Sequence, residues 1–156
     1  FSTQKVEYSN MNISEPKSLA LRHKVWSIRK IQRELISANF RLKTILPGEQ
    51  YSEVTDREIA SRVLHFFRDA VSALNTYLNA NGNWAETKFK EKVKRFLESL
   101  SEGLPKMKTR EGQEAVLSLL NEFCFALDHI ISLIENYLMT GNPVKEEITI
   151  ECTLFN

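Results

Sequence analysis

The sequence predicts an all-α protein, an antiparallel up-down-up-down four-helix bundle with short strand-like N- and C-terminal segments that can pair. Four long stretches repeat apolar residues at steps of three and four, which is helical spacing. The connections between them are short and rich in Gly, Pro and Asn, which favours antiparallel neighbours. The length of 156 residues suits a single helical-bundle domain over residues 1–156.

Residues 110–140 form the longest and most apolar of these stretches. At 100° per residue, the apolar positions cover about half of the helix circumference, which is wider than the stripe of an ordinary surface helix. Such a helix needs two or three partner helices, so we expect the bundle to be organised around it. Its apolar positions are Val116, Leu119, Leu120, Phe123, Leu127, Ile130, Ile131, Ile134, Tyr137 and Leu138.

Residues 15–46 are predicted to form the first helix. Ser14, Glu15 and Pro16 are a start signal, because Pro is tolerated in the first turn of a helix. Pro47 and Gly48 end the apolar pattern. The inward-facing positions are Leu21, Val25, Ile28, Ile31, Leu35, Ala38, Leu42 and Ile45.

Residues 56–79 are predicted to form the second helix. Thr55 and Glu58 have the spacing of a capping box, in which each side chain binds a free backbone N–H group of the other residue. The inward-facing positions are Ile59, Val63, Phe66, Phe67, Ala70, Val71, Leu74 and Tyr77.

Residues 84–102 are predicted to form the third helix, with Asn83 as its N-cap. Gly103 and the following Leu-Pro end it. Thr109 is placed to cap the fourth helix, 110–140, and Gly141 to end it. The inward-facing positions of the third helix are Phe89, Val93, Phe96, Leu97 and Leu100.

The two ends of the chain have strand character. Residues 1–13 alternate weakly and suit a strand or an extended arm, whereas residues 145–155 alternate cleanly between apolar and polar side chains. In an up-down-up-down bundle the two segments meet at the same end, so they can form a small antiparallel ribbon. An isolated ribbon is only marginally stable, so it must pack on the bundle or add to a partner's sheet.

The composition is that of a globular protein, with 42% hydrophobic and 26% charged residues. The net charge of +1 gives the whole molecule no attraction to nucleic acid or to an anionic membrane. No apolar run reaches the ~18 residues of a membrane span, because Glu122, Asp128, His129 and Glu135 interrupt the best one. We therefore expect no transmembrane segment.

Cysteine usage favours an intracellular location. Cys124 and Cys152 are too few for a disulfide scaffold, and two free thiols in a reducing compartment are favoured over one disulfide. A leader removed before Phe1 is compatible with the sequence, and the triplet Asn12-Ile13-Ser14 is a glycosylation sequon. An extracellular helical mediator therefore stays open as an alternative.

The motifs of common enzymes are absent from the sequence: a Gly-rich phosphate loop, GxSxG, HExxH and CxxC. None of His23, His65 and His129 follows a Glu by three residues, as the inward ligands of a di-iron bundle do. His65 and Asp69 are four apart, which suits a solvated ion pair. We expect no enzyme activity, no metal and no cofactor.

A second stripe of side chains runs along the first helix, on the side away from its apolar positions. Arginines alternate in it with Trp, Ile and Phe, and Trp and Arg are enriched among the residues that dominate binding energy at protein interfaces. The predicted function is a non-enzymatic interaction module that binds a protein partner or itself. The residues of this outer stripe, with a neighbouring lysine, are Arg22, Trp26, Arg29, Lys30, Arg33, Ile36 and Phe40.

Two other interpretations of the outer stripe stay open. In the first, the N-terminal arm or the C-terminal strand folds over the stripe and turns it into ordinary core. In the second, the protein binds nucleic acid, using basic and aromatic side chains for phosphate contact and base stacking. The residues of that second interpretation are Arg22, Trp26, Arg29 and Arg33 on the first helix and Trp84, Lys88, Lys92 and Arg95 on the third.

The first predicted helix is basic and the fourth is acidic. Residues 17–46 hold eight Lys or Arg and one acid, whereas residues 111–139 hold five acids and no Lys or Arg. If the fourth helix neighbours the first and the third, this pattern favours correct pairing of helix edges. The first and third helices would then be diagonal, which argues against one shared nucleic-acid groove. A bundle-interior ligand or cofactor protein is the last alternative.

Overall fold

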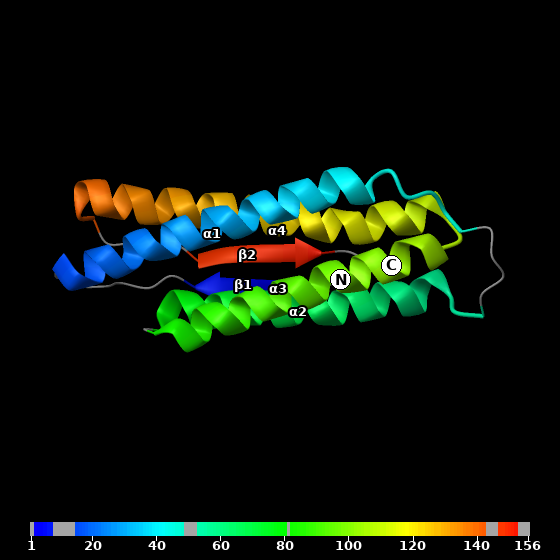
Figure 1. The fold of residues 1–156 in the computed structure, drawn as a ribbon, viewed down its shortest axis with the longest axis horizontal. Helices are drawn as coiled ribbons and strands as arrows, with labels where there is room; N and C mark the ends of the chain where they lie inside the picture. The colour runs from blue at the N-terminus through cyan, green and yellow to red at the C-terminus, as the bar shows by residue number, and fades with distance from the viewer. Residues whose placement is uncertain (1, 8–14, 49–52, 81, 143–146, 153–156) are drawn as a thin grey trace.

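The computed structural model is an all-α four-helix bundle with one two-stranded sheet (Figure 1). The structure describes residues 1–156 except for 1, 8–14, 49–52, 81, 143–146 and 153–156. The helices are α1 (Glu15–Leu42), α2 (Asp56–Asn79), α3 (Asn83–Gly103) and α4 (Arg110–Thr140), with a short 3-10 helix η1 (Leu104–Lys106) before α4. The strands are β1 (Ser2–Glu7) and β2 (Glu147–Cys152).

The capping residues fix the helix boundaries. The Thr55 side chain accepts a hydrogen bond from the Glu58 backbone N–H, and Thr109 accepts one from Gly112, so α2 and α4 begin where the sequence predicts. Gly141, with a φ of 71°, ends α4 in the left-handed conformation that favours glycine. The N-cap predicted for α3 is wrong by one residue: Gly82 holds that position, and Asn83 is already helical.

The end of α1 also differs from the prediction, since the helix stops at Leu42 rather than near residue 46. The carbonyl groups that follow it are bound from another helix: the Arg110 guanidinium donates to the backbone oxygens of Lys43 and Ile45. This contact ties the C-terminus of α1 to the N-terminus of α4.

The chain runs up, down, up and down through the four helices, but neighbours along the chain are not always neighbours in space (Figure 1). The largest contacts are between α2 and α3 and between α1 and α4, with further contacts of α4 with α2 and of α1 with α3. The expectation that the fourth helix neighbours the third is therefore wrong. Instead α1 lies diagonal to α2, and α3 lies diagonal to α4.

The first part of the connection between α1 and α2, residues 43–48, lies against the connection between α3 and α4. Within it, the backbone N–H of Gly48 donates to the Met107 oxygen on the α3–α4 connection. The approach is so close that a Cβ at position 48 would collide with the Pro105 backbone oxygen. Only glycine fits this crossing point without a shift of backbone.

The sheet closes the α2–α4 side of the bundle. Strands β1 and β2 pair antiparallel with Val6 opposite Ile148 and Gln4 opposite Ile150, as the sequence predicts for the two termini. Strand β2 packs on α4 and β1 packs on α2. Ile150 is fully buried and joins the core of the bundle, which anchors the ribbon.

Four phenylalanines fill the centre of the bundle. Phe67, Phe89 and Phe96 surround Phe123 of α4, with ring centroids 5.9, 6.3 and 6.1 Å from it. All four side chains are fully buried. Phe123 lies on the broad apolar side of α4 and contacts rings from both α2 and α3. The core is therefore organised around α4, as the sequence predicts.

Among the described helices, α4 alone is long and apolar enough to cross a membrane by length and composition. Half of the most apolar 18-residue stretch of α4 is buried inside the bundle. The core helix of a soluble protein passes the same test, so this property is weak evidence for a membrane span.

Candidate functional site

The outer stripe of α1 is open to solvent. Trp26 is 57% exposed and Phe40 is 70% exposed, and Ile36 between them is also exposed. The described strands pack on α4 and α2 rather than over this side of α1. The interpretation in which the terminal segments turn the stripe into core is therefore wrong.

The arginines of the stripe differ in their partners. Arg29 forms an ion pair with Glu135 of α4, whereas Arg22 and Arg33 form none with any described residue. The Lys30 ammonium lies 5.1 Å from the centroid of the Trp26 ring, and that of Lys43 lies 5.6 Å from the Phe40 ring. The exposed rings thus lie in a strongly positive setting.

Helix α4 contributes exposed apolar side chains that were not predicted to belong to this surface. Phe125 is 73% exposed and Met139 is 86% exposed. Met139 lines a shallow hollow of about 430 Å³ between the two helices, together with Arg22, Val25, Trp26, Arg29, Glu135 and Leu138. We call this surface the α1–α4 face: Arg22, Trp26, Arg29, Arg33, Ile36 and Phe40 of α1 with Phe125, Asp128, Glu135 and Met139 of α4.

Contacts between polar side chains fix which residues of α1 and α4 lie level with each other. The Asn39 amide nitrogen lies 3.1 Å from the Asn121 oxygen, and the Gln32 amide nitrogen lies 3.3 Å from the Asp128 carboxylate. The two helices run antiparallel between these points (Figure 1). Ile36 is therefore level with Phe125, which joins the apolar side chains of both helices into one surface.

A buried polar cluster joins α1 to the first turn of α3. The Glu86 carboxylate lies 2.9 Å from His23 Nε2, from Ser27 Oγ and from Lys90 Nζ. Burial alone would raise the pKa of Glu86, but the hydrogen bonds from Lys90, His23 and Ser27 outweigh it and lower the pKa to about 2. The cluster is therefore a charged clamp between two helices.

Lys24 supports the same end of the bundle from inside. Its ammonium donates to the backbone oxygens of Leu78 and Ala80 at the C-terminus of α2, where a cation is favourable. Burial lowers the pKa of Lys24, and burial raises the pKa of the adjacent Tyr77 to about 12. All of these groups hold helices together, and none is aligned as a nucleophile with a base.

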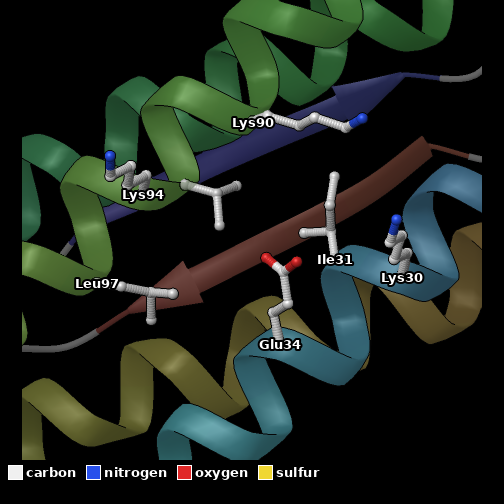
Figure 2. A pocket seen from close by; sticks show the side chains of 7 residues that line it. Lys30, Ile31, Glu34, Lys90, Lys94 and Leu97 are labelled. Carbon is white, nitrogen blue, oxygen red and sulfur yellow. The ribbon is translucent and has the colours of Figure 1, made fainter.

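Helices α1 and α3 border a basic groove of about 330 Å³ on the side opposite the sheet (Figure 2). Ile31 of α1 and Leu97 of α3 lie in it with Val93, and Glu34 projects between them. Lys30, Lys90 and Lys94 line its rim, although Lys90 is bound to Glu86. Lys90 and Lys94 were not predicted as part of a shared surface, because α1 and α3 were expected to be diagonal.

The stripe predicted on α3 lies on the other flank of that helix. Lys92 lies 3.8 Å from Asp69 of α2, and Arg95 lines a hollow shared with Arg62 of α2. Trp84 is 58% exposed at the start of the helix, and Lys88 is exposed. Although α1 and α3 are neighbours, their two predicted basic-aromatic stripes therefore point away from each other.

Other candidate groups are ordinary surface or packing features. His65 lies 3.6 Å from Asp69 on the exposed side of α2. Cys124 is a free thiol, and burial raises its pKa to about 11. Within the described ranges, no three His, Cys, Asp or Glu side chains converge as metal ligands would.

No family model, no curated protein and no solved structure matches this chain.

Proposed function

We propose that this protein is a non-enzymatic interaction module that binds a protein surface through the α1–α4 face. The observation that carries the proposal is the exposure of Trp26 and Phe40 on one side of an otherwise well-packed helix. Apolar side chains that are exposed together and rimmed by polar ones mark surfaces at which proteins associate.

The chemistry of the face supports protein recognition. Trp and Arg supply most of the binding energy at many interfaces, and here Arg22 and Arg33 have no partner among the described residues. Both helices are fixed by the core, so little conformational entropy is lost when a partner binds. The face is therefore a preformed site rather than a segment that must fold on binding.

The test is the double variant Trp26→Ser, Phe40→Ser. We expect the variant to keep its helical circular dichroism, because both side chains are mostly exposed. We also expect it to lose the proteins that the wild-type chain retains from an extract of its own cells. Trp84→Ser is the matched control, since Trp84 is exposed to nearly the same extent on α3.

Two results would contradict this proposal. If the double variant unfolds, the two side chains belong to the core. If it retains the same proteins as the wild-type chain and Trp84→Ser, the α1–α4 face does not bind them.

A second candidate function, nucleic-acid binding, is favoured by one observation, the basic groove between α1 and α3. Lys30 of α1 and Lys94 of α3 lie on opposite sides of it (Figure 2). Glu34 within the groove and the binding of Lys90 to Glu86 oppose this function. Affinity for a single-stranded oligonucleotide that falls steeply with salt, and falls again in Lys30→Glu, Lys94→Glu, would establish it.

A further inference from the structure

We infer that the occupant of the α1–α4 face is a second copy of this chain, related by a two-fold axis parallel to the helices. The inference rests on the proposed function and adds the identity of the partner and its orientation. It follows from the charges on the two helices, from the level at which their residues lie, and from the area of the face.

The face has opposite charge on its two halves. On the α1 half, Arg22, Arg29 and Arg33 are exposed and basic, whereas on the α4 half Asp128 and Glu135 are acidic. Helix α4 holds no Lys or Arg after Arg110. A surface with a basic row beside an acidic row is complementary to itself when a rotation exchanges the rows.

A two-fold axis parallel to the helices performs this exchange. This rotation places α1 of one copy on α4 of the other. It does not change the height of any residue along the helix direction. Within one chain, Gln32 contacts Asp128, so Arg33 and Asp128 lie at nearly the same height along the helices. The rotation therefore brings Arg33 of each copy to Asp128 of the other copy. The two-fold axis perpendicular to the helices would instead place α1 on α1, basic on basic, and is excluded by repulsion.

The apolar residues match in the same orientation. Ile36 is level with Phe125, so each copy places its exposed Ile36 on Phe125 of the other. Trp26 and Met139 already line one hollow within the chain, so the same pair meets between copies at the other end of the face. The dimer thus pairs exposed apolar residues of α1 with exposed apolar residues of α4 that lie at nearly the same level along the helices.

The area of the face is sufficient for a specific dimer. From Arg22 to Phe40 the face is about 27 Å long, and two helices ~8–10 Å apart offer a strip roughly 20 Å wide. This strip is about 540 Å² for each copy, and the total of roughly 1,100 Å² exceeds the ~1,000 Å² that a specific interface needs.

The test is a charge exchange followed by sedimentation of the full chain. Arg33→Glu and Asp128→Arg should each raise the dimer dissociation constant by about tenfold, because an attraction becomes a repulsion. The variant with both changes should return to within about threefold of the wild-type value, since the new carboxylate at position 33 then meets the new guanidinium at position 128 of the other copy. Arg57→Glu, at an exposed position of α2, is the control and should leave the constant unchanged.

A wild-type chain that stays monomeric at roughly 100 µM overturns the inference, because an interface of this size associates below that concentration. A dimer in which the double exchange does not restore affinity overturns the orientation and with it the inference. Neither result contradicts the proposed function. That function fails only if the double variant Trp26→Ser, Phe40→Ser unfolds or still binds the other proteins.

Discussion

At the scale of single residues, Glu86 shows how one carboxylate can hold two helices together. Its three donors lower its pKa from 4.5 to about 2, so the folded state favours the charged form. A depressed folded-state pKa contributes stability that is complete above the unfolded value near 4.5 and is lost as the pH falls toward 2. The shift corresponds to at most about 3 kcal/mol.

Glu86→Gln should therefore lower the free energy of unfolding by up to about 3 kcal/mol at pH 7, and the difference from wild type should shrink as the pH falls from about 4.5 to about 2. Urea unfolding at several pH values measures this. Glu91→Gln, at an exposed position of the same helix, is the control and should change little. A loss that is the same at neutral pH and near the folded-state pKa would show that Glu86 stabilises by packing alone.

Gly48 and Gly141 are needed for different reasons, and substitutions at the two positions should therefore have different effects on stability. A Cβ at Gly48 would collide with the Pro105 oxygen, so Gly48→Ala should cost about 1–3 kcal/mol. Gly141 has no neighbour within 4 Å of such a Cβ and needs only a left-handed backbone. Because Asn tolerates that conformation, Gly141→Asn should cost less than about 1 kcal/mol. Thermal unfolding of both variants measures the difference, and equal costs would contradict it.

The sequence predicts the stripe on α1 from periodicity, since Trp26 and Phe40 fall opposite the buried positions of their helix. It does not predict Phe125 and Met139 as part of the same surface. Their exposure can be inferred from the pattern of α4, but which helix lies beside them depends on tertiary packing. Glu86 is missed for the same reason, because its donors His23 and Ser27 lie 63 and 59 positions away in the chain.

At the scale of elements, side-chain caps determine where helices begin, and caps are local signals that a sequence shows directly. Thr55 and Thr109 cap α2 and α4 as predicted. Thr109 has a second role, because its hydroxyl also donates to Asp56 of α2 at 2.6 Å. Burial opposes the charge of Asp56, but hydrogen bonds from Thr109 and Lys108 lower the pKa of that carboxyl.

Thr109→Ala should therefore destabilise the protein by about 2 kcal/mol, whereas Thr55→Ala should cost about 1 kcal/mol, since only the first also removes a donor from a carboxylate. Chemical unfolding at neutral pH measures both values. In an Asp56→Asn background the cost of Thr109→Ala should fall to that of Thr55→Ala, and no change there would mean that the two residues act independently.

At the scale of the whole molecule, the ring order of the helices is the feature that the sequence does not predict. Helical periodicity fixes which face of each helix is buried but not which helix covers it. A signal exists in the connection lengths, because residues 43–55 separate α1 from α2, whereas only residues 80–82 separate α2 from α3. A connection of about 13 residues can span some 40 Å, enough to cross the diagonal of a bundle.

Chemical cross-linking distinguishes the two ring orders. The flank of α3 that carries Lys94 faces α1 here, but it would face α4 in a bundle whose sequential helices are all neighbours. We predict that Glu34→Cys, Lys94→Cys is joined by a short bismaleimide, and that Ser118→Cys, Lys94→Cys is not. Both variants need Cys124 and Cys152 replaced by Ser, so that the engineered thiols alone react.

Mass spectrometry of the protease digest identifies the joined peptides, and dilution below the dimer range keeps the reaction within one chain. The expected result is a link between α1 and α3 that forms in the folded protein and disappears in urea. A link between the thiols at positions 118 and 94 instead would restore the sequential ring and place the two basic stripes on a diagonal. The basic groove would then not exist, and nucleic-acid binding would lose its one supporting observation, whereas the α1–α4 face would stand, because α1 and α4 are neighbours in both arrangements.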